Sequence, residues 1–266
     1  MASFRTIELS DSLYERDGLR FMTVKSKALQ GRGDICLFIP SATQELADLP
    51  IYILLHGVYG SAWAWALKGG AHHTASAMMK SKRIQPAIIA MPSDGLWGDG
   101  SGYLNHTQKF ENWIVEDVPK AILENLPGAS TESPFCIGGL SMGGYGALMM
   151  GGKHPHRFKA ISGHSSITKL EQMSQFVEEP LAAYRTNLDD ENVLDVFIKN
   201  KSALPAIRFD CGLEDSLLSA NRQLHQALSD HEIVHIYEEF PGGHQWSYWQ
   251  EHLARTLEFF DQNLLC

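Results

Sequence analysis

A serine flanked by glycines stands where an apolar run gives way to a helix-compatible stretch. Gly139, Ser141 and Gly143 form a G-x-S-x-G pattern between the apolar residues 135–137 and the stretch 145–150. Between a strand and a helix, this pattern makes a sharp turn that strains the serine backbone and puts the hydroxyl at the helix N-terminus, whose free N–H groups favour a developing oxyanion. The sequence predicts Ser141 as a nucleophile in a nucleophile elbow. A glycine-rich turn with an incidental serine is the alternative.

A serine hydroxyl is a weak nucleophile, so it requires a base and an acid that orients the base. With this elbow the chain order is Ser, then Asp or Glu, then His. Asp215 follows the apolar run 206–211, where such a sheet delivers its acid. We expect Asp215 to be that acid, although capping of the next helix would also explain an aspartate there. Glu214 and Asp210 remain candidates for the same role.

The expected base is His244, in the glycine-containing loop 241–244 after the last candidate strand. The alternative is that His244 is an ordinary loop histidine exposed to solvent. The other histidines after Asp215 have simpler explanations on a surface helix, on a strand or on the polar face of the last helix: His225, His231, His235 and His252.

An oxyanion hole would need two backbone N–H donors, one of them from the residue after the nucleophile, Met142. The second is expected from the loop after the third candidate strand, where Gly57 allows the backbone to turn and Val58 presents its N–H. An ordinary glycine-containing strand exit is the alternative there.

Aromatic residues near this expected mouth are candidates for pocket lining, with core packing as the alternative: Tyr59, Trp97 and Trp246, and beside them Trp63 and Trp65. Two histidine pairs, 72–73 and 154–156, suggest metal ligands, but no acidic or cysteine residue accompanies either at useful spacing. We expect them to be surface histidines. The sequence predicts no metal and no cofactor.

The elements that must position these residues are short apolar runs alternating with longer helical patterns, which predicts β-α-β units and a mostly parallel sheet flanked by helices. One helix is expected at 110–126, with Pro119 bending it, and another over 246–264. The strand candidates are 34–39, 51–56, 87–91, 134–137, 158–162, 206–211 and 233–240, with an edge strand at 20–25.

The stretch 164–205 separates two of these strands by far more than the usual short connection and carries its own helical patterns. We interpret it as a small inserted cap on a single domain that comprises residues 1–266. Charged residues interrupt its apolar ones, so it offers no broad apolar surface for a lipid interface.

Composition excludes several classes for these 266 residues. Hydrophobic residues make up 44% and charged ones 20%, which suits a globular chain. The net charge of −9 and scattered Lys and Arg argue against a nucleic-acid partner. Neither a membrane span nor a signal peptide is visible, and the four cysteines are far apart, so we expect reduced thiols in a cytoplasmic protein. The oligomeric state stays open, a homo-oligomer included.

Together these residues resemble the esterase family of α/β-hydrolases that includes tributyrin, feruloyl and acetyl-xylan esterases, S-formylglutathione hydrolase and mycobacterial mycolyltransferases. The likeness covers residues 20–257, and its specific segments are 54–57, 139–147, 212–215 and 242–246. It implies the α/β-hydrolase fold, Ser141, Asp215 and His244 as a triad, and Val58 and Met142 as oxyanion donors.

Two departures within the family narrow the expected function. S-formylglutathione hydrolases typically have a histidine where this chain has Tyr145, and mycolyltransferases lack the pair Gly143-Gly144. The resemblance therefore implies a serine carboxylesterase acting through an acyl-enzyme on small, soluble, short-chain esters. An acyltransferase or thioester hydrolase with the same triad is the alternative, and a non-catalytic binding module is disfavoured because all three triad positions are filled.

Overall fold

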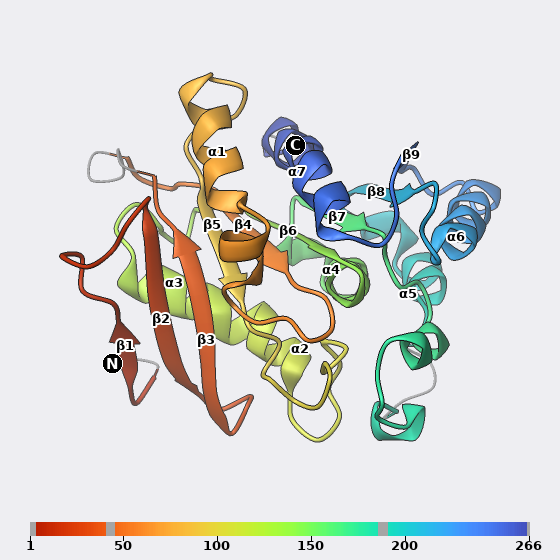
Figure 1. The fold of residues 1–266 in the computed structure, drawn as a ribbon, viewed down its shortest axis with the longest axis horizontal. Coiled ribbons are helices and arrows are strands. Elements are labelled where there is room, and N and C mark those ends of the chain that lie inside the picture. The colour runs from red at the N-terminus through yellow and green to blue at the C-terminus, as the bar shows by residue number, and fades with distance from the viewer. Residues whose placement is uncertain (1–3, 41–45, 186–190, 265–266) are drawn as a thin grey trace.

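One twisted sheet organises the chain (Figure 1). The computed structural model describes residues 4–40, 46–185 and 191–264, and within those ranges nine strands pair in the order β1-β2-β3-β5-β4-β6-β7-β8-β9. Their bounds are β1 Ile7–Leu9, β2 Leu19–Ser26, β3 Gly31–Phe38, β4 Ile51–Leu55, β5 Ile88–Pro92, β6 Phe135–Leu140, β7 Ala160–His164, β8 Ala206–Gly212 and β9 Ile236–Phe240.

The sheet changes character at β5. From β1 to β5 neighbouring strands pair antiparallel, and from β5 through β4 to β9 every pair is parallel. All residues of β4, β5 and β7 are buried, as expected for parallel strands covered on both faces. Because parallel strands end at the same edge, the loops after β4, β6, β8 and β9 converge there.

Helices cover both faces of the sheet. The core on one face includes side chains of α3, α4, α5 and α6, and the core on the other face includes those of α1 and α7, which lie side by side in Figure 1. The helix bounds are α1 Ala71–Lys80, α2 Phe110–Asn112, α3 Val118–Asn125, α4 Met142–Lys153, α5 Val193–Lys199, α6 Leu218–Asp230 and α7 Trp246–Gln262.

Shorter helical segments connect these elements. Within the described part of the chain, two are π-type, at 64–68 and 113–117, and four are 3₁₀-type. In order they are η2 Ala64–Lys68, η3 Trp113–Asp117, η4 Pro155–Arg157, η5 Leu170–Gln175, η6 Leu181–Ala183 and η8 Lys201–Ala203.

Three expected elements differ from the structure. The strand predicted at the edge, β2, is not an edge strand, because the three residues of β1 pair with its outer side. The predicted helix 110–126 is interrupted by the π-type turn η3, and Pro119 lies directly after this turn, at the start of α3. The last helix ends at Gln262, so Leu264 lies beyond it while remaining buried.

The stretch between β7 and β8 carries η5, η6, α5 and η8. Helix α5 packs against α4 and thus belongs to the helical layer of the domain. The preceding part is attached by buried tyrosines: the Tyr145 hydroxyl donates to the Glu191 carbonyl (2.8 Å) and the Tyr184 hydroxyl to the Gly100 carbonyl (2.9 Å). Those contacts hold the inserted segment against α4 and against the loop that contains Gly100.

Cys36, Cys136 and Cys211 are buried and free, and burial raises the pKa of each thiol, to about 12 for Cys36. Cys266 lies outside the described residues. Among the residues that the structure describes, no helix has both the length and the apolar character needed to cross a membrane.

Candidate active site

Ser141 lies at the turn between β6 and α4, with φ 55° and ψ −118°. This left-handed backbone is costly for a serine and is imposed by its neighbours. Its N–H donates to the His164 carbonyl of β7 (2.9 Å), and its own carbonyl accepts from Tyr145 N–H (3.0 Å). A Cβ at Gly139 would overlap the Gly143 carbonyl, so the crowded turn requires glycine.

The loops after β6, β8 and β9 bring three predicted residues together. His244 Nε2 lies 3.0 Å from Ser141 Oγ, and His244 Nδ1 lies 3.0 Å from one Asp215 carboxylate oxygen and 3.1 Å from the other. Ser141 and Asp215 are buried, whereas His244 is partly exposed. The arrangement is a continuous hydrogen-bonded chain from carboxylate to imidazole to hydroxyl, with the distances that proton transfer needs.

The Asp215 carboxylate is built to stay ionised. Burial alone would raise its pKa, but hydrogen bonds from His244, from the Leu217 N–H (2.8 Å) and from Ser165 outweigh burial, and the pKa is lowered. An ionised acid can hold the imidazole in one orientation and stabilise a positive charge on it.

The two other candidate carboxylates have different partners. Asp210 is fully buried on β8 and bonds His164 Nδ1 (2.9 Å) and Arg208 (2.6 Å), not His244. Glu214 is exposed and accepts the N–H of Gly242, so it fastens the loop that carries His244.

The His244 ring is held by aromatic neighbours. Phe176 of the inserted segment stacks on it (ring centroids 5.2 Å apart), and Trp249 of α7 meets it edge-on (5.0 Å).

The other histidines that follow Asp215 in the chain lie away from this site. His231 is exposed and His225 bonds His235 (2.7 Å), but the expectation of a polar-face His252 is wrong, because that ring is buried and stacks on Phe240.

Val58 and Met142 lie on either side of the serine. A Cβ at Gly57 would touch both the Leu140 side chain and Ser141 Cβ, which shows how closely the loop after β4 approaches. Within the described residues, neither Val58 N–H nor Met142 N–H is used in another hydrogen bond. Oxyanion holes are made from N–H donors of this kind, near a nucleophile at a helix N-terminus.

A buried histidine and aspartate, His56 and Asp94, hold this loop. His56 Nε2 accepts from the Asp94 N–H (3.1 Å), so His56 Nδ1 is left to donate to the Gly57 carbonyl (2.7 Å). The Asp94 carboxylate accepts from the N–H groups of Leu96 and Ser101 (2.9 and 2.6 Å), which orders the glycine-rich stretch 94–100. The bond from His56 fixes the direction of the Gly57 peptide and thereby of the Val58 N–H.

A cavity of about 380 Å³ opens beside Ser141 and His244. Tyr59 and Trp246 line it as expected, and so does Trp63. The expectation for Trp97 is wrong: its ring packs instead against His106 and Tyr184 and is no part of this wall. The full lining is Gly57, Val58, Tyr59, Gly60, Trp63, Ala64, Lys68, Leu140, Ser141, Phe176, His244, Gln245, Trp246 and Trp249.

Sequence reasoning missed three features of the site. Phe176 carries no signal because it follows the short segment η5 of the inserted stretch and belongs to no recognisable motif. The His56–Asp94 and His164–Asp210 pairs join residues far apart in the chain. His56 and Asp94 each stand directly before a glycine at a strand exit, and that shared position is the only local hint.

The chain is similar to known esterases over most of its length. A family model described as "Putative esterase" matches residues 26–260. An acetyl esterase of Caldicellulosiruptor saccharolyticus is 30% identical over 236 residues, which cover 81% of this chain and 84% of that protein.

Solved structures bear on the fold. A ferulic acid esterase superposes with a TM-score of 0.80 at 22% identity, covering 98% of this chain and 100% of that one. The S-formylglutathione hydrolase FrmB of Staphylococcus aureus superposes with a TM-score of 0.77 at 15% identity, covering 95% and 99%. The fold is that of the α/β-hydrolases, as the sequence predicted.

Proposed function

The chain belongs to the esterase family, and from that premise we propose that it is a serine carboxylesterase that hydrolyses small, soluble, short-chain acyl esters through an acyl-enzyme. The observation that carries the proposal is the hydrogen-bonded chain Asp215–His244–Ser141 at the wall of an apolar cavity. No cofactor is needed for this chemistry.

In the proposed first step, His244 Nε2 takes the proton of Ser141 Oγ while the oxygen attacks the acyl carbonyl. The carbonyl π electrons move to oxygen, and the N–H groups of Val58 and Met142 stabilise the negative charge, assisted by the positive end of α4. The protonated His244, stabilised by Asp215, then gives its proton to the leaving alcohol oxygen as the C–O bond breaks.

In the second half, water replaces the alcohol. His244 removes a proton from the water as its oxygen attacks the acyl-enzyme, and the same two N–H groups again hold the oxyanion. Collapse of the intermediate breaks the bond to Ser141 Oγ, which takes the proton back from His244, and the carboxylic acid leaves. Deacylation thus uses the same residues, with water as the nucleophile and Ser141 Oγ as the leaving group.

Ester hydrolysis and labelling of one serine test the proposal. The purified chain should hydrolyse p-nitrophenyl acetate and react with a fluorophosphonate at Ser141, located by mass spectrometry of the labelled peptide. Ser141→Ala should lower kcat by a factor on the order of 10⁶ and abolish labelling. Ser174→Ala, which changes an exposed serine of the inserted segment, is the matched control and should retain both.

Retention of more than a few per cent of the turnover in Ser141→Ala would overturn the nucleophile. A matched thioester belongs in the same panel. A kcat/KM for the thioester far above that for the oxygen ester would replace the carboxylesterase proposal by thioester hydrolysis with the same residues.

A further inference from the structure

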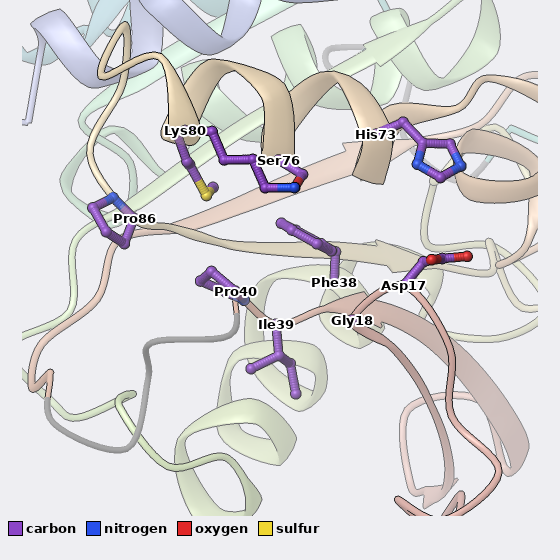
Figure 2. Close-up of a pocket in the computed structure, with 10 residues that line it drawn as sticks. Asp17, Gly18, Phe38, Ile39, Pro40, His73, Ser76, Lys80 and Pro86 are labelled. Atoms are coloured by element: carbon purple, nitrogen blue, oxygen red, sulfur yellow. The ribbon is translucent and has the colours of Figure 1, made fainter.

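A second group of chemistry-bearing side chains lies away from the serine. His72 and His73 occupy the first turn of α1, and Asp17 lies in the loop before β2. One ligand atom of each residue lies within 4.8 Å of the ligand atoms of the other two. Figure 2 shows the Asp17 carboxylate and the His73 ring at the same end of a neighbouring pocket.

This grouping corrects the expectation for the histidine pair at 72–73. His73 is exposed as predicted, but His72 is buried, with 4% of its surface accessible. The acidic partner that the local sequence lacks comes from Asp17, which the fold brings across from the N-terminal strands.

His72 supplies an observation independent of the grouping. Its Nδ1 is buried and has no hydrogen-bond partner among the described residues, an arrangement that is costly for a polar atom. The two imidazole rings lie 3.9 Å apart between centroids. His72 therefore has an unpaired ring nitrogen beside the exposed ring of His73.

The backbone holds Asp17 in place. Asp17 has φ 57° and Gly18 has φ 75°, and the Gly18 carbonyl accepts from the Ile39 N–H (2.8 Å). A Cβ at Gly18 would lie 2.8 Å from the Ile39 oxygen and 2.9 Å from the Phe38 ring, so the turn is packed tightly against the end of β3. The carboxylate therefore projects from a fixed turn.

From this geometry we propose that Asp17, His72 and His73 bind a divalent transition-metal ion of the zinc type. Two imidazole nitrogens and one carboxylate oxygen are the donors that zinc accepts, at about 2.0–2.2 Å. Tetrahedral binding brings ligand atoms to about 3.4 Å of one another, so movements of about an ångström by the exposed Asp17 and His73 complete the set.

The fourth position would face the adjoining pocket of about 540 Å³, which Asp17 and His73 line together with Ser76 and Lys80 (Figure 2). Because the positive end of a helix disfavours a cation, the negative charge of Asp17 is essential for binding at the start of α1. The bound ion would fasten the loop before β2 to the first turn of α1.

Zinc binding to the untagged, chelator-treated full chain tests the proposal. Isothermal titration with zinc chloride should give one site, cobalt(II) should give the intense visible bands of a four-coordinate ion, and zinc should raise the Tm. Asp17→Asn and His73→Ala should each raise Kd by about tenfold or more, since loss of even an outer partner of a metal ligand costs about that much. Both change exposed side chains and leave the buried His72 in place.

His156→Ala is the matched control, because it removes another exposed histidine, in the short segment η4, and it should bind zinc as the wild type does. The proposal is overturned if the wild type binds no zinc at millimolar concentrations. It is equally overturned if Kd is unchanged in either Asp17→Asn or His73→Ala, or if His156→Ala is the variant that loses binding.

Discussion

Three carboxylates lie close together in the sequence but have different partners and therefore different roles: Asp210, Glu214 and Asp215. Asp215 bonds the ring of His244, Asp210 belongs to a buried ionic network, and Glu214 holds a loop from the surface. Since only Asp215 reaches the imidazole, it alone can fix the tautomer in which Nε2 accepts the serine proton.

We predict that Asp215→Asn lowers kcat for p-nitrophenyl acetate by roughly 10⁴, because an amide at this position favours the wrong imidazole tautomer. The folded structure should persist, as judged by circular dichroism. Glu214→Gln is the control and should keep kcat within a few-fold of the wild type. If Glu214→Gln proves the more damaging change, the acid has been assigned to the wrong carboxylate.

Asp210 is predicted to act on stability instead. Burial alone would raise the pKa of this carboxyl, but His164, Arg208 and the Tyr248 hydroxyl outweigh burial and lower the pKa far below its ordinary value. A lowered folded-state pKa means stability that is present above the unfolded value of about 3.9 and is lost as the pH falls below it.

Accordingly, Asp210→Asn should reduce the free energy of unfolding at pH 7 by about 3–5 kcal/mol, the usual cost of removing one partner of a buried ion pair. The difference in unfolding free energy between wild type and variant should narrow as the pH falls from about 4 toward 2. Urea unfolding of both proteins at about pH 4 and at about pH 2 measures this difference. A gap that stays constant or widens in acid would contradict the assigned pKa direction.

At the scale of elements, the turn from β6 to α4 that carries Ser141 depends on closely packed backbone. A Cβ at Gly143 would overlap the carbonyl oxygen of Leu55 and lie 2.5 Å from that of His56, and neither can move without disrupting the end of β4. Gly70, before α1, has φ 65°, but a Cβ added there would meet no atom within 4 Å. A substitution at Gly143 therefore tests steric overlap, whereas a substitution at Gly70 tests backbone strain alone.

We predict that Gly143→Ala costs on the order of 4 kcal/mol or more in unfolding free energy, or prevents folding. Gly70→Ala should cost only about 1–2 kcal/mol, the penalty for a left-handed residue with a side chain. Thermal unfolding of both variants, with the yield of soluble protein, makes the comparison. Equal and small effects would show that the elbow tolerates a methyl group.

Elements with a strong pattern were predictable from the sequence, and irregular ones were not. The buried strands β4 and β5 stand out as apolar runs, whereas β1 has only three residues, too few for a pattern to be recognised. The π-type turn η3 is hidden because its residues fit a helical pattern until their hydrogen bonds are examined. Ser141, Asp215 and His244 were accessible because each lies in the turn or loop that follows a strand, a position that the sheet order makes meaningful.

At the scale of the whole molecule, the parallel sheet and the inserted segment together define the cavity. The carboxyl edge presents Ser141 and His244, and the insert adds Phe176 above the His244 ring. Trp246 lines the opposite wall and is held by its neighbours. Trp246 packs edge-on against Trp65 (5.7 Å) and has Lys68 over its face (5.5 Å). At about 380 Å³, the cavity is near the small end of ligand sites.

This size predicts a preference for short acyl chains. Each methylene that fits should gain up to ~0.8 kcal/mol of burial, and the gain should stop or reverse when the chain meets the rigid Trp246 wall. On p-nitrophenyl esters, kcat/KM should therefore peak between acetyl and butyryl and fall beyond about six carbons. Phe176→Ala opens the side formed by the insert and should move the peak to longer chains, whereas Ser174→Ala should not. A wild-type peak at eight carbons or longer would mean that the insert forms an acyl tunnel, and the short-chain preference would have to be abandoned.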